Sequence, residues 1–497
     1  MSGALVKAFL DDIVANIDDD TPRLVLADWL MENGQDDRAE FIRVQIERTR
    51  LPSWDAAQVR LRLREQELLK QHGENWLSEL PVIKGMRWEG FRRGIVAEVS
   101  FASFEALRVN AQACRAFAPV EAVTVCWPRR LEAKKAGRPI AELRELTLTG
   151  RPYEDEIAWL AASPQLATLR ALTVLGLSAE DLSELAASPH LTGLRALRLA
   201  SNGLGAAGVR ALIQAATLTA LEELDLSGPG YHEHYYEDPI IGAAGMESLA
   251  GWEGLARVKS LTLTGSDVRR AGLRALVRSP HAGALTHLSL RGGRLDGQAM
   301  AEFGSAAPGL RLQTLDLGEN VLKDLGAGYV AAAPCLGELK ELRLDRCEIP
   351  LAGARALAKA TFFGGLRLLD VGHNYFGPTG LAALLERGPP SLHTLRMRDN
   401  NLFDKGAALL ADSAASDALL EVDLGENSLG ATAALALGAS AHLGGLLVLR
   451  LSDNPINESD TATLAASALG RRLAVLEFED PPFPEGSPFF DEDDTPF

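Results

Sequence analysis

Residues 312–344 read LQTLDLGENVLKDLGAGYVAAAPCLGELKELRL, in which the frame L-x-x-L-x-L begins at Leu312 and again at Leu339. This frame recurs along most of the chain, and its first positions are residues 143, 169, 194, 221, 258, 285, 312, 339, 366, 392, 419, 446 and 473. Eleven of the twelve steps are 25 to 27 residues long. Such a fixed period indicates a solenoid, in which each unit buries its apolar face against its neighbours.

Each repeat predicts a short strand followed by a helix. Three positions after the last leucine of the frame stands Asn at residues 202, 320, 374, 400, 427 and 454, and Cys347 takes the same position. An Asn side chain can bind backbone groups left over where a strand ends. A Gly-rich turn and an Ala/Leu stretch with helical spacing follow. Because neighbouring strands lie about 4.8 Å apart and helices need about 10 Å, we expect a curved arc with the strands inside.

The frame and its Asn/Cys position resemble the leucine-rich repeats of ribonuclease-inhibitor type over residues 143–479. The resemblance implies an α/β horseshoe with a parallel inner sheet and outer helices. Two atypical capping repeats are expected within residues 81–142, where GIVAEVSF (94–101) and VEAVTVCW (120–127) each fit a strand.

Residues 1–80 carry a separate pattern, TPRLVLADWLMENGQDDRAEFIR from Thr21. Pro22 suits the first turn of a helix, Gly34 is expected to end it, and a second helix is expected from about Arg38. The apolar residues expected to face the core are Leu24, Val25, Leu26, Trp29, Leu30, Phe41, Ile42 and Val44. The pattern resembles a small repeat-companion domain found ahead of leucine-rich arrays in certain bacterial proteins. That resemblance implies a helical domain and a bacterial origin, and no chemistry.

The charge of the chain is concentrated at its two ends. Of the net −17, residues 1–80 contribute −6 and residues 473–497 contribute −8, so −3 remains for the part between them. A nearly neutral array lacks the basic surface that nucleic acids require. The sequence contains no run of about 18 apolar residues, so we expect no membrane-spanning segment. With acidic residues near the start instead of a signal peptide, we expect a cytoplasmic protein.

Catalytic and cofactor motifs are missing from the sequence. The four cysteines form no metal-ligand spacing, and there is no P-loop, H-E-x-x-H or G-x-S-x-G motif. The stretch GLGAAG (203–208) has the form of a dinucleotide-binding turn, but similar turns recur with the repeat, so we assign it to the repeat. We therefore expect a protein that is not an enzyme and holds no cofactor or metal.

A strip of alternating charge is expected on the inner sheet. The position between the second and third leucines carries, in order, Asp316, Arg343, Asp370, Arg396, Asp423 and Arg450. In parallel register each Arg would lie between two carboxylates. Two interpretations remain open: a ladder that fixes the register of the repeats, or a recognition surface for a partner of complementary charge.

The one long step, from Leu221 to Val258, contains a ten-residue insert, YHEHYYEDPI (231–240). Its candidate contact residues are Tyr231, His232, His234, Tyr235 and Tyr236. Tyrosine-rich loops on a rigid scaffold suit protein contacts. A metal site at the two histidines and a simple solvated insertion are the alternatives.

The last segment, residues 480–497, is an acidic tail rich in Pro and Phe. It covers the open end of the array, serves as a disordered interaction motif, or folds back toward the basic residues of the inner strip.

Together these features predict a non-enzymatic, monomeric scaffold that binds a partner protein on its concave face, assisted by residues 231–240. The alternatives are a regulator of an enzyme, of inhibitor or GTPase-activating type, and a metal-dependent enzyme at the insert.

Overall fold

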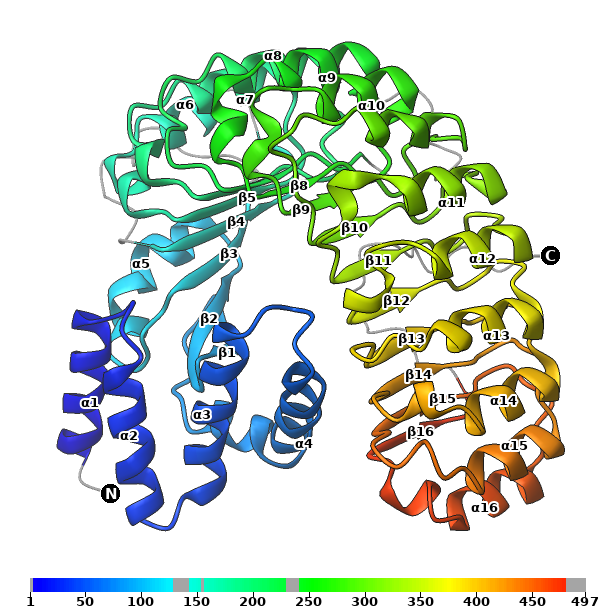
Figure 1. Cartoon of the computed structure of the whole chain (residues 1–497). Coiled ribbons are helices and arrows are strands. Elements are labelled where there is room, and N and C mark those ends of the chain that lie inside the picture. Colours follow the sequence, from blue (N-terminus) through cyan, green and yellow to red (C-terminus); the bar gives the residue numbers. More distant parts are fainter. Residues whose placement is uncertain (1–2, 128–142, 153–155, 229–240, 480–497) are drawn as a thin grey trace, which may run out of the picture.

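The computed structural model describes residues 3–127, 143–152, 156–228 and 241–479. Within these ranges the chain forms an arc whose inner side is one sheet of sixteen strands, in the order β1 to β16, and whose outer side carries the helices (Figure 1). The α/β leucine-rich-repeat horseshoe expected from the sequence is confirmed. No helix among the described residues is long and apolar enough to cross a membrane.

From β2 onward, neighbouring strands pair in parallel, one strand from each repeat. The strands are β1 (Met86–Arg92), β2 (Ile95–Phe101), β3 (Ala122–Cys126), β4 (Glu145–Thr149), β5 (Ala171–Val174), β6 (Ala196–Arg198), β7 (Glu223–Asp225), β8 (Ser260–Thr262), β9 (His287–Ser289), β10 (Thr314–Asp316), β11 (Glu341–Arg343), β12 (Leu368–Asp370), β13 (Thr394–Arg396), β14 (Glu421–Asp423), β15 (Val448–Arg450) and β16 (Val475–Glu477).

In the described residues the outer layer consists of the α-helices that follow the strands and, after β9, of a 3₁₀ helix, while other short 3₁₀ helices lead into the next strand. The α-helices are α5 (Phe104–Arg115), α6 (Glu156–Ala161), α7 (Ala179–Ala186), α8 (Gly205–Ile213), α9 (Gly242–Ala250), α10 (Arg269–Val277), α11 (Lys323–Ala332), α12 (Leu351–Ala358), α13 (Gly377–Arg387), α14 (Phe403–Ala411), α15 (Ala431–Gly438) and α16 (Glu458–Ala466). The 3₁₀ helices are η2 (Pro164–Thr168), η3 (Leu191–Gly193), η4 (Glu253–Arg257), η5 (Ala282–Ala284), η6 (Ala299–Ser305), η7 (Pro334–Leu336), η8 (Phe363–Gly365), η9 (Ala414–Ser416) and η10 (Gly470–Arg472). After β9 it is η6 that lies between α10 and α11.

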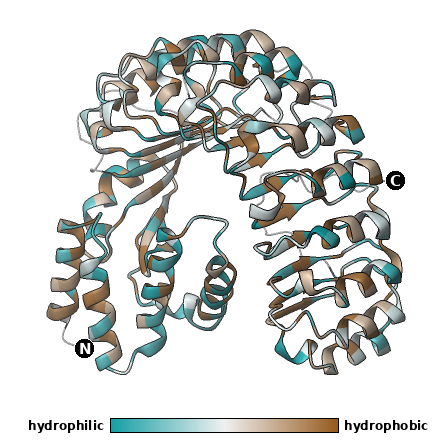
Figure 2. Cartoon of the chain, viewed as in Figure 1, coloured by the Kyte–Doolittle hydropathy of each residue, from teal (hydrophilic) through white to brown (hydrophobic). Residues whose placement is uncertain are grey.

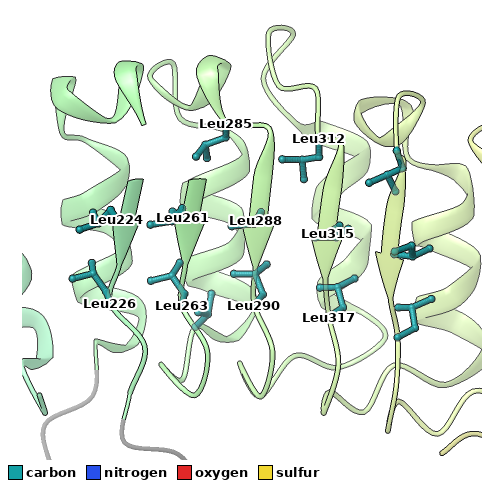
Figure 3. Packing of buried hydrophobic residues seen from close by; sticks show 14 of the residues in the cluster. Leu224, Leu226, Leu261, Leu263, Leu285, Leu288, Leu290, Leu312, Leu315 and Leu317 are labelled. Atoms are coloured by element: carbon teal, nitrogen blue, oxygen red, sulfur yellow. The ribbon is translucent and has the colours of Figure 1, made fainter. Parts of the chain in front are cut away.

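The leucines of the frame form the core between the sheet and the outer helices. Leu224, Leu261, Leu288 and Leu315 lie in one row across neighbouring strands, and Leu226, Leu263, Leu290 and Leu317 lie in a second row (Figure 3). All eight are at most 3% exposed. Fully burying one leucine side chain contributes about 1.5–3 kcal/mol, so the stacked rows supply the main stabilisation. Apolar and polar residues interleave along the outer helices, which turn one face to this core (Figure 2).

The asparagine ladder expected at the strand ends is confirmed. The buried Asn374 accepts backbone N–H groups of Cys347 and Ile349 on Oδ1, at 3.2 and 2.8 Å. Its Nδ2 donates to the carbonyl of Leu344 in the preceding repeat at 2.8 Å. Cys347 stands in the same position and donates from Sγ to the Leu317 carbonyl at 3.2 Å. Each ladder residue thus ties its own turn to the repeat before it.

Ahead of the array lie four helices, α1 (Gly3–Ala15), α2 (Thr21–Glu32), α3 (Asp36–Arg50) and α4 (Ala57–Ser78). The predicted helices match α2 and α3, and Gly34 follows α2 with a left-handed φ of +74°. The expectation that Val25 faces the core is wrong, because 49% of this residue is exposed.

Strands expected around 94–101 and 120–127 are present as β2 and β3. Strand β1, which the sequence did not predict, pairs antiparallel with β2 and forms one edge of the sheet. Its residues change from buried at Met86 to half-buried at its end, where Phe91 packs against Phe41 and Trp76.

Candidate functional site

The concave face of the sheet presents the charged strip, defined as Asp316, Arg343, Asp370, Arg396, Asp423 and Arg450. These residues occupy matching positions of adjacent strands, from Asp316 opposite Arg343 to Asp423 opposite Arg450. The stacking in register that the sequence predicted is therefore confirmed.

The strip aspartates make backbone hydrogen bonds that the sequence did not predict. Asp316 accepts the backbone N–H of Gly318 at 2.9 Å, and Asp423 accepts that of Gly425 at 3.0 Å. Asp370 does the same with Gly372 at 3.1 Å. Burial raises the pKa of Asp316 and of Asp370. These carboxylates fix the turn at the end of every second strand, which is a structural task.

The strip arginines pair with a second row of acids on the same face. Arg343 forms an ion pair with Glu341, two positions earlier on its own strand. Arg396 and Arg450 bind Glu421 Oε1 at 3.3 and 2.7 Å. Arg343 lies in register between Asp316 and Asp370, as the sequence predicted, and it forms its ion pair with Glu341 of its own strand.

The other two arginines, Arg396 and Arg450, also contact carboxylates of a neighbouring strand. Arg396 approaches Asp370 at 3.7 Å, and Arg450 binds Glu477 at 2.8 Å. Residues i and i+2 of a strand share a face. The sequence carried a signal for this second row, because the outward position two residues before the strip position holds Glu341 and Glu421.

The arm, defined as residues 51–63, crosses from the N-terminal helices to this concave face. The Trp54 ring stacks on His287, with 5.5 Å between ring centroids. The Trp54 carbonyl accepts a hydrogen bond from His393 Nε2 at 2.8 Å. Ser53 Oγ donates to Glu341 Oε2 at 3.3 Å. The loop before α4 therefore spans strands β9 to β13.

The first turns of α4 continue the contact on β14 and β15. Val59 packs with Leu420 and Val448 in an apolar cluster that also contains the half-buried Leu63. Arg62 Nη2 binds Glu421 Oε2 at 2.6 Å. In Figure 1, α4 is the N-terminal helix that faces the C-terminal repeats across the opening of the arc.

Residues of the concave face are more deeply buried where the arm contacts them than at equivalent positions of other repeats. Glu341 and Glu421 are 3% and 1% exposed, and Val448 is fully buried. At the same position of repeats outside the arm's contacts, Glu223 and Ser260 are only half-buried. The arm thus covers the part of the sheet where the sequence placed the recognition surface.

The N-terminal helices are fixed to the first strands by Arg23, within the TPRL…RAEFIR pattern, and by Gln45, two residues after it. Arg23 is fully buried and donates to Glu121, the residue ahead of β3, at 2.8 Å. Gln45 accepts the backbone N–H of Gly94 at 2.6 Å. Gly94 has a φ of +82°, and a Cβ there would lie 2.2 Å from the Ile42 Cα. These contacts hold α2 and α3 against the first strands of the sheet.

A polar cavity of about 930 Å³ lies between the arm, α3 and strands β1 to β4. Its ionisable lining consists of Arg48, Arg50, Arg62, Arg92, Arg93, Asp18, Asp20, Glu65, Glu121 and Glu145. The five arginines and five carboxylates balance, and most are paired, such as Arg92 with Glu145 and Arg93 with Glu121. The cavity has no excess charge with which to select an anion.

The described residues include one group with the spacing of metal ligands, His373, Asp399 and Glu426, whose ligand atoms lie within 4.8 Å of one another. Two guanidinium groups already occupy it. Arg398 Nε binds Glu426 Oε1 at 2.7 Å, and Arg346 Nη2 lies 3.3 Å from His373 Nε2. Because these cations would repel a metal ion, we assign no metal here.

The predicted insert with Tyr231, His232, His234, Tyr235 and Tyr236, and the tail 480–497, lie outside the described residues. The GLGAAG turn (203–208) leads into α8, and the cavity beside it measures about 10 Å³. That volume holds about one water molecule and no nucleotide.

A family model described as leucine-rich repeat matches residues 190–212 and 388–411, which contain β6 and β13. A search of curated proteins gives no match. Among solved structures the chain is similar to an internalin (inlF) from Listeria monocytogenes, at 19% identity over 68% of this chain and 81% of that chain, with a TM-score of 0.35. It is also similar to a chain of the Rad7 and Elc1 complex in yeast, at 13% identity over 91% of this chain and 94% of that chain, with a TM-score of 0.43. The repeat sequence and the stacked strand–helix units of the array give it the fold of a leucine-rich-repeat solenoid.

Proposed function

We propose that the protein is a non-enzymatic cytoplasmic scaffold that binds a partner protein on the concave face of the array. The observation that carries the proposal is the in-register row of charged side chains on that face. Arg343, Arg396 and Arg450 keep 38%, 30% and 28% of their side chains exposed. Held by Glu341 and Glu421, these arginines are pre-positioned, so a partner's acidic groups would meet them at a small cost in side-chain entropy.

The rigidity of the array supports this use. A sheet built from stacked leucines holds its outward side chains at fixed spacing, and extended concave surfaces of solenoids are well suited to proteins. We further propose that the repeats are of ribonuclease-inhibitor type and that residues 1–80 form a repeat-companion domain. Residues 81–142 would be the capping repeats, 143–479 the regular repeats, and 231–240 a second contact with the partner.

The test is affinity capture with the full chain from the native lysate. One variant replaces Arg343, Arg396 and Arg450 by Gln, and another lacks residues 231–240. A matched control replaces three exposed cations of the outer helices α12 and α14, Arg355, Lys359 and Lys405, by Gln.

We expect a partner that wild type and the control capture equally and that the concave-face variant captures at least about tenfold less well. Each variant is used well below its own thermal unfolding midpoint, because removal of Arg396 and Arg450 from the buried Glu421 is expected to lower that midpoint. Equal recovery by the concave-face variant would place the binding surface elsewhere.

A further inference from the structure

The concave patch, defined as His287, Glu341, His393, Leu420, Glu421 and Val448, has polar atoms whose partners come from two different sources. Arg396 and Arg450, which belong to the array, hold Glu421 Oε1. The other oxygen, Oε2, is bound by Arg62 of the arm. Glu341 is divided in the same way between Arg343 and Ser53. The array therefore leaves one oxygen of each buried carboxylate for an incoming donor.

The remaining patch residues also have groups that the array itself leaves without a partner. His393 Nδ1 is satisfied within its own repeat by Thr394 Oγ1 at 3.1 Å, and its Nε2 binds the carbonyl of Trp54. His287 offers a ring face, and Leu420 and Val448 offer apolar surface. A buried polar group that loses its partner costs about 1–3 kcal/mol, so this patch is stable only when covered or solvated.

The chemistry of an occupant follows from these positions. It needs a hydroxyl or N–H for Glu341, an aromatic ring for His287 and a backbone carbonyl for His393. A helix must then follow, with two aliphatic residues one turn apart and an arginine between them for Glu421. Val59, Arg62 and Leu63 meet that pattern, since residues i and i+4 share a helix face.

We propose that the arm is a resident occupant of a binding site, and that the partner enters as a helix of the same aromatic–arginine–aliphatic chemistry and displaces the arm. This inference rests on the proposed function, because it names the partner's chemistry at the same face. Arg23 and Gln45 anchor α2 and α3 on the first strands without any contribution from the arm. Because residues 57–63 are the first turns of α4, the arm leaves the patch when these turns unwind or tilt while α2 and α3 stay seated.

The probe is a labelled synthetic peptide, LPSWDAAQVRLRLREQ, which copies residues 51–66. Its binding is measured by fluorescence anisotropy up to millimolar protein, because a tethered arm competes at an effective concentration of about a millimolar. The full chain is used as wild type and as an arm-released variant, Trp54→Ala with Val59→Asp. The matched control is Val82→Asp, since Val82 is fully exposed.

We expect the arm-released variant to bind the peptide at least about tenfold more tightly than wild type and the Val82→Asp control. Adding Glu421→Gln to the arm-released variant should weaken binding at least about tenfold, as should Arg62→Glu in the peptide. Absence of binding to the arm-released variant, or binding that ignores both changes, would overturn the proposal.

A second measurement examines the arm itself. Trypsin should cut after Arg50, Arg60 and Arg62 faster in the arm-released variant than in wild type, because closed packing protects the chain. Equal cleavage rates in the two proteins would contradict the arm's position on the patch.

The two proposals fail separately. If the peptide binds as expected but partner capture is unchanged by removal of the strip arginines, the proposal that the partner binds the charged strip is wrong and the role of the arm stands. Capture that depends on the strip, together with no peptide binding, would sink the arm's role as occupant.

Discussion

Glu421 joins the two ends of the molecule through its two carboxylate oxygens. Arg62, Arg396 and Arg450 surround it, and together they lower its pKa to about 2 although burial acts in the opposite direction. An ionised carboxylate at this depth is tolerated because each oxygen has a guanidinium partner. Its stabilising contribution is complete above the ordinary Glu pKa of about 4.3 and is lost as the pH falls toward 2.

At Arg396, charge reversal separates the two interpretations of the strip. Arg396→Asp would place a carboxylate beside Asp370 and Glu421, both of which the arginine now neutralises. We expect a loss of about 1–3 kcal/mol, measured as a lower urea midpoint, and a smaller loss for Arg396→Gln. An unchanged midpoint with partner capture abolished would mean that the strip serves recognition and not stability.

Asn374 carries a larger share of stability than any exposed residue nearby. Asn374→Ala would strand two N–H groups and the carbonyl of Leu344 in the core, whereas the carbonyl of Val371 keeps its hydrogen bond from Asn400 Nδ2. Each unsatisfied group costs about 1–3 kcal/mol, so we expect a loss of at least about 3 kcal/mol in urea unfolding. Lys359→Ala on α12 is the control and should stay within about 0.5 kcal/mol. A similar midpoint for both variants would refute the ladder's role.

Among the elements, the arm and the start of α4 make the contacts that the repeats do not explain. The arm ends in a helix whose later residues, Leu68 and Trp76, pack on Phe41 of α3. One face of α4 therefore belongs to the N-terminal domain while its first turns belong to the array. This division lets one short segment span the opening of the arc.

The arm's contact should weaken in mild acid. Burial lowers the pKa of His287 and of His393, so both are neutral on the patch. Because burial outweighs the hydrogen bond to the Trp54 carbonyl, which raises the pKa of His393, protonation favours the detached arm. The contact is complete above the ordinary histidine pKa of about 6.5 and weakens as the pH falls below it. The facing charged groups are Glu341 for His287, and Arg367, Asp55 and Glu421 for His393.

The measurement is tryptic cleavage of the arm, followed between pH 7.5 and 5.5 and corrected for trypsin activity on a free peptide. Relative cleavage should increase toward pH 5.5 in wild type. The variant His287→Gln with His393→Gln should show a flatter dependence. A pH-independent wild type would show that these histidines do not control the contact.

The elements of the array could be read from the sequence because a fixed period encodes them locally. Leu312 to Asn320 specify a strand and its turn without reference to distant residues. The arm could not be read in this way, because Arg62 and Glu421 are separated by 359 residues. A signal was present nonetheless, since Val59 and Leu63 give α4 an apolar face at its start. The second acidic row also has a sequence signal, because Glu341 and Glu421 stand two positions before strip residues and therefore share their face of the sheet.

At the scale of the whole molecule, the arc is braced by its own N-terminal domain. Arg23 and Gln45 seat that domain on the first strands, and the arm reaches the strands of the C-terminal half. A solenoid contacts only neighbouring repeats, so its curvature depends on many small interfaces. A brace that joins both halves fixes this curvature and occupies the concave face at the same time. Release of the arm would then expose the patch and at the same time remove the brace that fixes the curvature of the arc.

The most direct test of this account is a cross-link between Val59 and Leu420, which pack together from opposite ends of the chain. Val59→Cys and Leu420→Cys are introduced into a Cys126→Ser background, because Cys126 is the exposed one of the four native cysteines. Val82→Cys with Leu420→Cys is the control. After mild oxidation and non-reducing digestion, mass spectrometry should find the intramolecular disulfide in most monomeric chains of the first variant and in few of the control. An equal yield in the two variants, or a disulfide found only between chains, would contradict the closed arc.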